Sequence, residues 1–350
     1  MILNRGKEII KRYVDNNELP GAVFAYVERD YVEKDLYGYK SLLPVKEKLN
    51  FDTLYDIASL SKVVATSTMV FKLVEEGLIS FKTKVRSILP EYPFEDVIVR
   101  DLLTHVSGIA GDDKDYKKCK TEEQLWQFIM NLPRIYDKGT KCVYSCFGYI
   151  ILGKIIEHYK GSLEKYLDET LCEPLGTSNI MYCPQKKGRE SDCAATEVTE
   201  ARGIIKGVVH DGKCNIMNGV AGNAGIFADI DSLTRYVQMI LNDGVYNGNT
   251  VLKKSTVQLL KKVYTPGLNE MRTIGGWLAG DLNQSDGDYV SEHSLYHTGF
   301  TGTSIYIDFD RGCGIILLAN AVHPSRVHKM IEIRNLFHNQ VLIAADESKI

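Results

Sequence analysis

The sequence predicts an α+β fold: one antiparallel sheet built from both chain ends and flanked by terminal helices, together with a mainly helical lobe. Strand-like segments lie near both ends of the 350-residue chain, and segments with helical periodicity occupy its middle. When distant strands share one sheet, the helices between them form a layer of their own. We therefore expect a sheet lobe from residues 1–60 and 245–350 and a helical lobe from 61–244, joined in one integrated unit.

The amino-terminal part predicts a helix followed by a β-hairpin. Apolar residues recur among the charges of residues 1–17 as in an amphipathic helix, at Leu3, Ile9, Ile10 and Val14. Residues 22–28 and 35–39 are rich in aromatic and β-branched side chains, which favours two strands. Because they are close in sequence, we expect them to pair as a hairpin.

The middle of the chain predicts helices, and the carboxyl end predicts three strands and a last helix. The expected helices of the middle are residues 62–76, 99–105, 121–132, 149–159 and 232–242. Glycines stand where several of them should end, at Gly77, Gly161 and Gly244. The later strands are expected at 294–299, 303–310 and 313–320, and the last helix at 326–343.

The amino-acid composition favours a globular protein and argues against nucleic-acid-binding and membrane-spanning classes. With 44% hydrophobic and 25% charged residues, the chain can bury a substantial core. A net charge of −3 without long basic runs argues against a nucleic-acid partner, and no apolar stretch is long enough to span a membrane. The eight cysteines show no CxxC spacing and are expected to be reduced thiols. The amino terminus lacks the continuous apolar centre of an export signal, so we expect a cytoplasmic location.

The segment DIASLSKV contains a serine and a lysine in the pattern SxxK, Ser59 and Lys62. One helical turn places an amine beside a hydroxyl, and burial disfavours the charged form of a lysine, so that it can take the serine proton near neutral pH. Ser162 and Lys165 satisfy the same pattern in an amphipathic segment without other chemical residue types. Only Ser59 lies where a strand-like run meets a helix start, whose free N–H groups can stabilise an oxyanion.

Two further segments suggest partners for Ser59. In KCVYSCFGY, Tyr144 precedes a helix, and a phenol beside a lysine can relay protons; alternatively it is a large residue at a helix entrance. In HTGFTGTS, glycines allow a ligand to approach the backbone, so His297 and Thr298 can bind a substrate and the Phe300 amide can serve as a second oxyanion donor. The alternative there is a plain turn with an exposed histidine.

Taken in order, the motifs SLSK, DLLTHVSGI, YSCFGYIILGKIIE and HTGFTGTS resemble the serine β-lactamase-like superfamily. The resemblance is to its class C branch, which groups β-lactamases with penicillin-binding D-alanyl-D-alanine carboxypeptidases, D-aminopeptidases and esterases. It covers residues 19–320. It implies a fold of the β-lactamase and transpeptidase type.

The resemblance implies roles for individual residues. Ser59 is expected to be the acylated nucleophile, Lys62 its partner and Tyr144 the proton relay, with Lys62 or Tyr144 as the base. The strand from His297 to Gly299 takes the place of the family's KTG, and the amides of Ser59 and Phe300 form the oxyanion hole. No metal or cofactor is implied.

Two departures from the family pattern bear on the substrate. Cys146 stands where the pattern YxN has an asparagine that binds the substrate amide, and a thiol is a weak donor and acceptor. His297 replaces a lysine and is mostly neutral at pH 7, so it holds a carboxylate less strongly. His105 is expected to be structural, His210 to lack a ligand partner, Asn223 to border the cleft, and Trp277 to lie in the core or line the pocket.

These observations predict a serine hydrolase that forms an acyl-enzyme on Ser59 with an ester or a D-amino-acid amide or peptide. A β-lactamase is one alternative, and a catalytically weak penicillin-binding or scaffold protein is another. The expected partners are a small-molecule or peptide substrate and β-lactams as covalent ligands. The natural substrate and the oligomeric state stay open.

Overall fold

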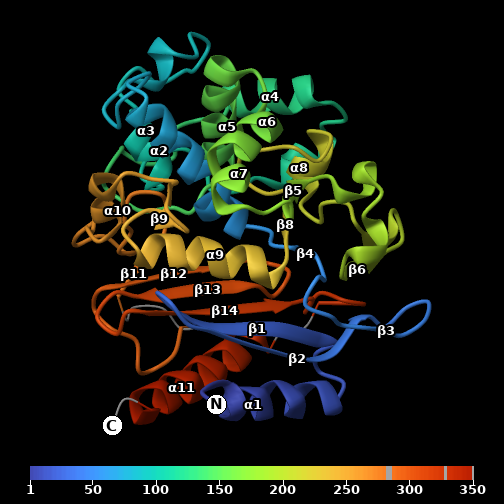
Figure 1. The fold of residues 1–350 in the computed structure, drawn as a ribbon. Coiled ribbons are helices and arrows are strands. Elements are labelled where there is room, and N and C mark those ends of the chain that lie inside the picture. Colours follow the sequence, from blue (N-terminus) through green and yellow to red (C-terminus); the bar gives the residue numbers. More distant parts are fainter. Residues whose placement is uncertain (281–285, 327–328, 349–350) are drawn as a thin grey trace.

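The computed structural model describes residues 1–280, 286–326 and 329–348. Within these ranges an antiparallel sheet of seven strands crosses the molecule, and most of the helices lie on one side of it (Figure 1). In spatial order its strands are β11 (Leu278–Ala279), β12 (Ser294–Thr298), β13 (Ser304–Asp308), β14 (Cys313–Ala319), β1 (Gly21–Glu28), β2 (Val32–Ser41) and β3 (Glu47–Lys48). Strands from both chain ends share this sheet, which confirms the predicted α+β fold.

Strand β1 connects the two ends of the chain. It pairs with β2 on one side, as the predicted hairpin requires, and with β14 on the other, where Ala22 lies opposite Ala319. Its alternate side chains enter two different cores. Ala22, Phe24 and Tyr26 pack under the terminal helices, and Val23, Ala25 and Val27 join the core of the helical side. A strand buried on both faces favours such a continuous apolar run.

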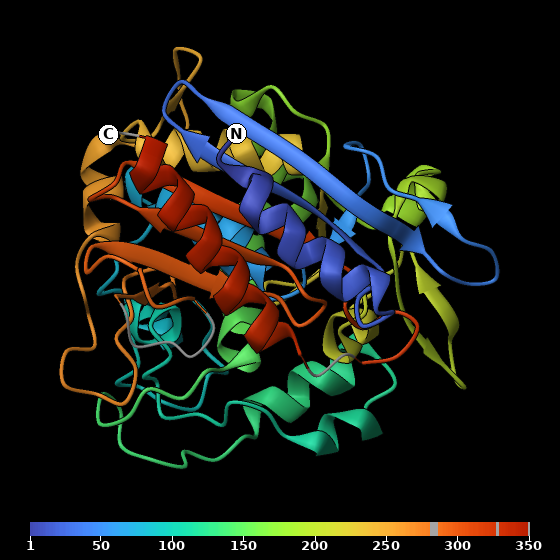
Figure 2. The same ribbon diagram turned by 90° about the horizontal axis from the view of Figure 1, so that it is seen from below.

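The terminal helices α1 (Leu3–Asp15) and α11 (Met330–Ser348) lie side by side across the outer face of the sheet (Figure 2). Their closest approach is at Gly6, where a Cβ atom would lie 2.8 Å from the Phe337 ring. The predicted last helix is confirmed from Met330 onward, and it continues to Ser348. The predicted positions 327 and 328 lie outside the described residues.

The helices of the rest of the chain are α2 (Ser67–Glu75), α3 (Val99–Leu103), α4 (Glu122–Met130), α5 (Cys146–Lys160), α6 (Leu163–Leu167), α7 (Glu173–Leu175), α8 (Gly212–Ile216), α9 (Ile230–Leu241) and α10 (Lys254–Leu260). All five predicted helices are present. Helix α5 begins at Cys146 and not at residue 149, because the Ser145 hydroxyl caps it by accepting a hydrogen bond from the Gly148 N–H at 3.1 Å. Helix α9 packs directly on the sheet (Figure 1).

Short elements escaped the sequence analysis. The small sheets are β4 (Tyr55–Asp56), β8 (Ile226–Ala228) and β5 (Ile180–Tyr182); β6 (Ala195–Thr199) and β7 (Gly203–Lys206); and β9 (Val245–Tyr246) and β10 (Asn249–Thr250). Single helical turns that were not predicted lie at Val85–Ser87, Lys114–Lys118, Asp168–Cys172, Pro184–Lys187 and Glu190–Asp192, whereas the turn at Lys62–Thr66 belongs to the predicted helix 62–76. Segments of two to five residues are too short to show a periodic pattern.

No helix among the described residues is long and apolar enough to cross a membrane. The cytoplasmic location and the division into two lobes at residues 60 and 245 stay predictions.

Truncation of a buried ring should test the packing of α11 on the sheet. Phe337 is fully buried and meets Phe24 edge-to-face at 5.2 Å, so we expect Phe337→Ala to lower the free energy of unfolding by about 3 to 5 kcal/mol. Ile331 on the same helix is 54% exposed, and Ile331→Ala should cost less than about 1 kcal/mol. Urea unfolding checks both variants. Similar losses would contradict this assignment of the buried face.

A buried histidine of α11 should make stability depend on pH. Burial lowers the pKa of His338 to about 4, against a smaller opposing effect of its hydrogen bond to the Asp286 carbonyl at 2.8 Å. The unfolded chain binds this proton near pH 6.5, so the free energy of unfolding should fall as the pH drops below that value. Between pH 7 and pH 5, His338→Gln should lose about 1 to 2 kcal/mol less than the wild type. Urea unfolding at both pH values tests this, and the exposed His158→Gln should behave like the wild type.

Candidate active site

Ser59 lies in a tight turn between strand β4 and a helix. The residue before it, Ala58, has a φ of +48°, a left-handed conformation that side chains rarely adopt. The buried carboxylate of Asp56 holds this turn, because Oδ1 accepts the Ala58 N–H at 2.8 Å and Oδ2 accepts the His210 N–H at 2.7 Å. Leu60 begins the helix. Ser59 itself is half-buried and therefore open to a ligand.

Lys62 is completely buried directly beneath Ser59. Its Nζ lies 3.2 Å from Ser59 Oγ and donates to the Asn223 carbonyl at 2.7 Å. The helix makes a π-turn over Lys62–Thr66, a local irregularity that is frequent at functional sites. Burial lowers the pKa of Lys62, but Cys146 and Tyr144 raise it more, so its pKa lies above the ordinary value.

Tyr144 packs against this ammonium group. The Lys62 Nζ lies 5.0 Å from the centre of the Tyr144 ring, within the range of a cation–π contact. The Tyr144 hydroxyl is buried and has no hydrogen-bond partner among the described residues. Burial raises the pKa of Tyr144, and the charge of Lys62 opposes this shift. The arrangement leaves a phenol ready to exchange a proton with groups beside it.

His105 holds the segment that carries Tyr144. Its Nδ1 accepts the Ser145 N–H at 3.0 Å, and its ring lies 4.7 Å from the Tyr144 ring. Burial together with the charges of Arg272 and Lys62 holds the pKa of His105 well below its ordinary value. The neutral ring can accept this hydrogen bond, in agreement with the structural role expected from the sequence.

The HTG segment lies against the Ser59 turn. His297 in β12 is 4% exposed, which excludes the plain turn with an exposed histidine. Its Nδ1–H donates to the Thr298 carbonyl at 2.9 Å, and its ring lies 5.9 Å from that of Tyr144. Burial and the charge of Arg272 keep the pKa of His297 well below its ordinary value. A neutral His297 can offer a hydrogen bond to a substrate but no charge.

Hydrogen bonds join the turn after His297 to the chain before Ser59. Thr301 Oγ1 donates to the Asp56 carbonyl at 2.7 Å, and Thr303 Oγ1 donates to the Ile57 carbonyl at 3.2 Å. The turn after His297 lies so close to the chain before Ser59 that a Cβ atom on Gly299 would be 2.5 Å from the Ile57 oxygen. Glycine is therefore required at this position.

The two amides expected to form the oxyanion hole are unpaired. Within the described residues, neither the Ser59 N–H nor the Phe300 N–H donates a hydrogen bond to another protein atom. Because both residues are partly or largely exposed, their N–H groups are available to a ligand. Ser59, Lys62, Tyr144 and the HTG turn therefore meet at one place.

The other predicted residues have different environments. Cys146 is the half-buried first residue of α5, close enough to influence the pKa of Lys62. Asn223 contributes its carbonyl to Lys62, while its side chain donates to Asp211 at 3.0 Å. Trp277 is fully buried in the core, with its ring edge-on to His297 at 6.4 Å.

Sequence reasoning missed two buried arginines and misjudged one histidine. Arg272 lies 5.4 Å from the Tyr144 ring, and Arg334 of α11 donates to the carbonyls of Gly299 and Thr303, both at 3.1 Å. The expectation that His210 lacks a carboxylate partner is wrong, because its Nε2–H donates to Glu197 at 2.9 Å. Because His210 and Glu197 are separated in the sequence, residue spacing did not indicate this pair. The one available signal for Arg334 was its position on the apolar face of a predicted helix.

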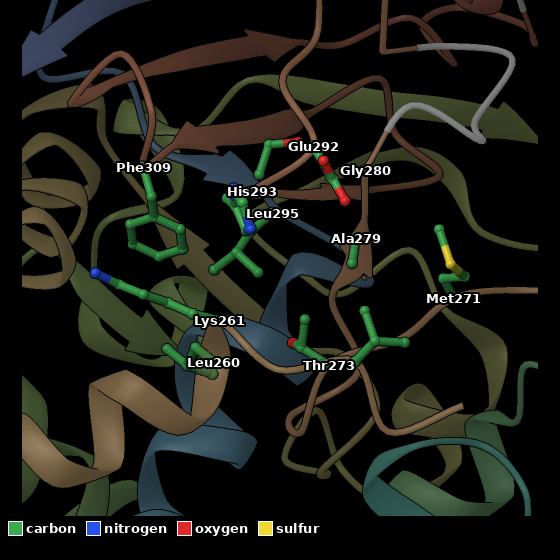
Figure 3. A pocket seen from close by; sticks show the side chains of 12 residues that line it. Leu260, Lys261, Met271, Thr273, Ala279, Gly280, Glu292, His293, Leu295 and Phe309 are labelled. Carbon is green, nitrogen blue, oxygen red and sulfur yellow. The ribbon is translucent and has the colours of Figure 1, made fainter. Parts of the chain in front are cut away.

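A cavity of about 460 Å³ lies beside the edge strands β11 and β12, lined by Leu260, Lys261, Val263, Met271, Thr273, Ala279, Gly280, Glu292, His293, Ser294, Leu295 and Phe309. Figure 3 shows Phe309 and Met271 at its opposite ends. Ser59, Lys62 and Tyr144 do not line it. The cavity is therefore separate from the site around Ser59.

The sheet closed by both chain ends, with this serine, lysine and HTG strand at its edge, defines a protein of the serine β-lactamase-like and penicillin-binding superfamily. The family model described as Beta-lactamase matches residues 7–338. The chain therefore belongs to the Beta-lactamase family.

Relatives of known name are similar over most of their length. An N-acetylmuramyl-L-alanine amidase of Bacillus subtilis is 31% identical over 87% of this chain and 78% of its own length. A protein of Escherichia coli named "Putative D-alanyl-D-alanine carboxypeptidase" is 30% identical over 82% of this chain and 73% of its own length.

Solved structures share the fold at lower identity. Simvastatin synthase from Aspergillus terreus has a TM-score of 0.79 at 19% identity, covering 99% of this chain and 98% of its own. The octameric penicillin-binding protein homologue from Pyrococcus abyssi has a TM-score of 0.78 at 21% identity, covering 98% of this chain and 78% of its own. The hydrolase EstCE1 has a TM-score of 0.76 at 18% identity, covering 96% and 98%.

A single methyl group should disturb the contact between the HTG turn and the Ser59 turn. In Gly299→Ala the new Cβ would meet Thr303 Oγ1 and the Ile57 oxygen, so we expect the rate of acylation by an ester to fall by about tenfold or more. Gly148 in α5 has room for a Cβ, with its nearest neighbour at 3.7 Å, and Gly148→Ala should keep the rate. Stopped-flow acylation measures both. An unchanged rate in Gly299→Ala would contradict the close contact.

Proposed function

We propose that the protein is a serine hydrolase that forms an acyl-enzyme on Ser59 with an ester or a D-amino-acid amide or peptide. The observation that carries the proposal is the Lys62 Nζ, buried 3.2 Å from the Ser59 hydroxyl at the start of a helix. A buried cation beside a serine, next to unpaired backbone amides, is suited to acyl transfer. The names of the amidase and carboxypeptidase relatives support this class of reaction.

In the first step, Ser59 Oγ bonds to the carbonyl carbon of the substrate. Its proton passes to the pair formed by Tyr144 and Lys62, which accepts it when the pair holds one proton fewer than its fully protonated form. The carbonyl oxygen becomes an anion that the amides of Ser59 and Phe300 stabilise. As the tetrahedral intermediate collapses, the bond to the leaving alcohol or amine breaks and the leaving group takes the proton. Water then attacks the acyl group through the same steps and restores Ser59.

Tyr144 and Lys62 act as the base together, and the role is not assigned to either residue alone. The reactive form of the pair is either phenolate with ammonium or phenol with amine, and the raised pKa of Lys62 favours the first. Its charge favours the phenolate form of Tyr144, whereas burial disfavours that form. Two groups that interact so closely titrate together. We propose that Tyr144 moves the proton while Lys62 supplies the compensating charge.

The surroundings of the site favour hydrolysis of esters or D-amino-acid amides over efficient turnover of β-lactams. Cys146 offers only weak hydrogen bonds where an amide side chain would bind the substrate amide. His297 is neutral and offers no charge to a carboxylate. β-Lactams should therefore acylate Ser59, but the acyl-enzyme that they form should be hydrolysed slowly. Rapid hydrolysis of that acyl-enzyme would instead indicate a β-lactamase.

Intact-protein mass spectrometry tests the proposal. After exposure to benzylpenicillin or a fluorophosphonate, the wild type should gain the mass of one probe, and Ser59→Ala should gain none. Ser162→Ala is the matched control: Ser162 belongs to the other SxxK pair but caps α6 by accepting the Lys165 N–H at 3.3 Å. It should be labelled like the wild type.

The same variants should differ in turnover of a panel of nitrophenyl esters and D-Ala-D-Ala peptides. Ser59→Ala should lower kcat/KM by about a thousandfold or more, because it removes the nucleophile. Fast turnover of a chromogenic cephalosporin would favour the β-lactamase. A wild type that no probe labels would overturn the proposal in favour of a binding or scaffold protein.

A further inference from the structure

A cluster of four side chains surrounds the turn that carries the Phe300 amide. The Phe300 ring is 57% exposed, yet the His210 ring stacks on it at 5.5 Å with an angle of 22° between the planes. The Arg326 guanidinium lies 5.1 Å from the centre of the same ring. Glu197 binds both of these partners, His210 at 2.9 Å and Arg326 at 3.2 Å. The exposed ring of Phe300 is thus held by a closed set of contacts.

The cluster is built from separate parts of the chain. Glu197 comes from β6, His210 from the loop before α8, Phe300 from the turn between β12 and β13, and Arg326 from the segment before α11. Burial raises the pKa of Glu197, but the hydrogen bonds from His210 and Arg326 lower it more, so it lies below its ordinary value. A carboxylate that stays charged can bind both partners continuously.

The same histidine also reaches the turn that carries Ser59. The backbone N–H of His210 donates to Asp56 at 2.7 Å, and the other oxygen of Asp56 accepts the Ala58 N–H at 2.8 Å. His210 is therefore linked to the turn that carries Ser59 through Asp56, and its ring contacts Phe300 directly. A displacement of either turn is opposed through these contacts.

We propose that His210, Glu197 and Arg326 are positioning residues that clamp the Phe300 turn and keep its amide aligned with that of Ser59. This proposal rests on the proposed function, because it assigns to the clamp the geometry of the oxyanion hole. Donors of an oxyanion hole act only when they are held at the position that the developing charge will occupy. The clamp thus affects the rate of acylation and not the binding of the substrate.

The contacts of His210 allow the clamp to be tested without disturbing Asp56. In His210→Ala the ring is lost, while the backbone N–H that binds Asp56 remains. In His210→Phe the stacking on Phe300 is kept but the bond to Glu197 is lost. His293 is the matched control, because it pairs with Asp310 at 3.1 Å on the surface and contacts none of the clamp residues.

We expect His210→Ala and Glu197→Gln to lower the stopped-flow acylation rate by about tenfold, while the dissociation constant of a nitrophenyl ester, taken from the concentration dependence of that rate, stays within twofold of the wild-type value. His210→Phe should recover part of the lost rate, and His293→Ala should match the wild type. A loss confined to the dissociation constant, or equal rates in His210→Ala and His293→Ala, would overturn the clamp. Thermal unfolding must show that each variant is folded.

Hydrogen exchange of the Phe300 turn gives a readout that needs no catalysis, carried by the Gly299 and Gly302 amides, which donate to the carbonyls of Thr303 and Gly299 at 2.8 and 3.1 Å. The peptide that covers residues 297–304 should exchange faster in His210→Ala and Glu197→Gln than in the wild type and in His293→Ala. Unchanged exchange would overturn the clamp even if activity fell. If no probe acylates the wild type, the proposed function fails, and the exchange measurement alone then decides whether the clamp exists.

Discussion

The antiparallel pairing of β1 with β14 is the constraint on which the rest of the structure depends. It joins the first strand of the sheet to a strand near the carboxyl end. Ser59 follows the amino-terminal strands, whereas Gly299 and Phe300 belong to the carboxyl-terminal ones, so sheet closure is what brings them together. The bonds from Thr301 to Asp56 at 2.7 Å and from Thr303 to Ile57 at 3.2 Å then hold the two turns together. Without that pairing the site has no fixed geometry.

Buried positive charge is the second organising feature. Lys62, Arg272 and Arg334 are each at most 7% exposed, and each donates to backbone carbonyl oxygens, an arrangement that offsets part of the cost of removing a cation from water. Burial, together with the charges of Arg272 and Lys62, holds the pKa values of His105 and His297 well below the ordinary value, which suits these rings to packing and hydrogen bonding. In a site with so little water, the same charges act strongly on any anion that forms there.

Much of this arrangement could be predicted from local patterns. Five strands of the main sheet and the longer helices show clear patterns, whereas β3 and β11, of two residues each, were not predicted. Ser59, Lys62, Tyr144 and His297 lie in motifs whose order is specific. What escaped prediction depends on contacts between distant segments. Residue spacing does not indicate that His210 pairs with Glu197 or that Arg334 donates to Gly299.

The hydrogen bond from Thr301 to Asp56 spans 245 residues of sequence and has a consequence for biosynthesis. While the ribosome makes the chain, the turn around Ser59 emerges long before its counterpart exists, and β1 leaves the exit tunnel without β14. The nascent amino-terminal hairpin therefore exposes an unpaired strand edge and an apolar face for most of translation. Chaperones that bind such strand edges have a long interval in which to act. The site around Ser59 can assemble only after the last strands have left the ribosome.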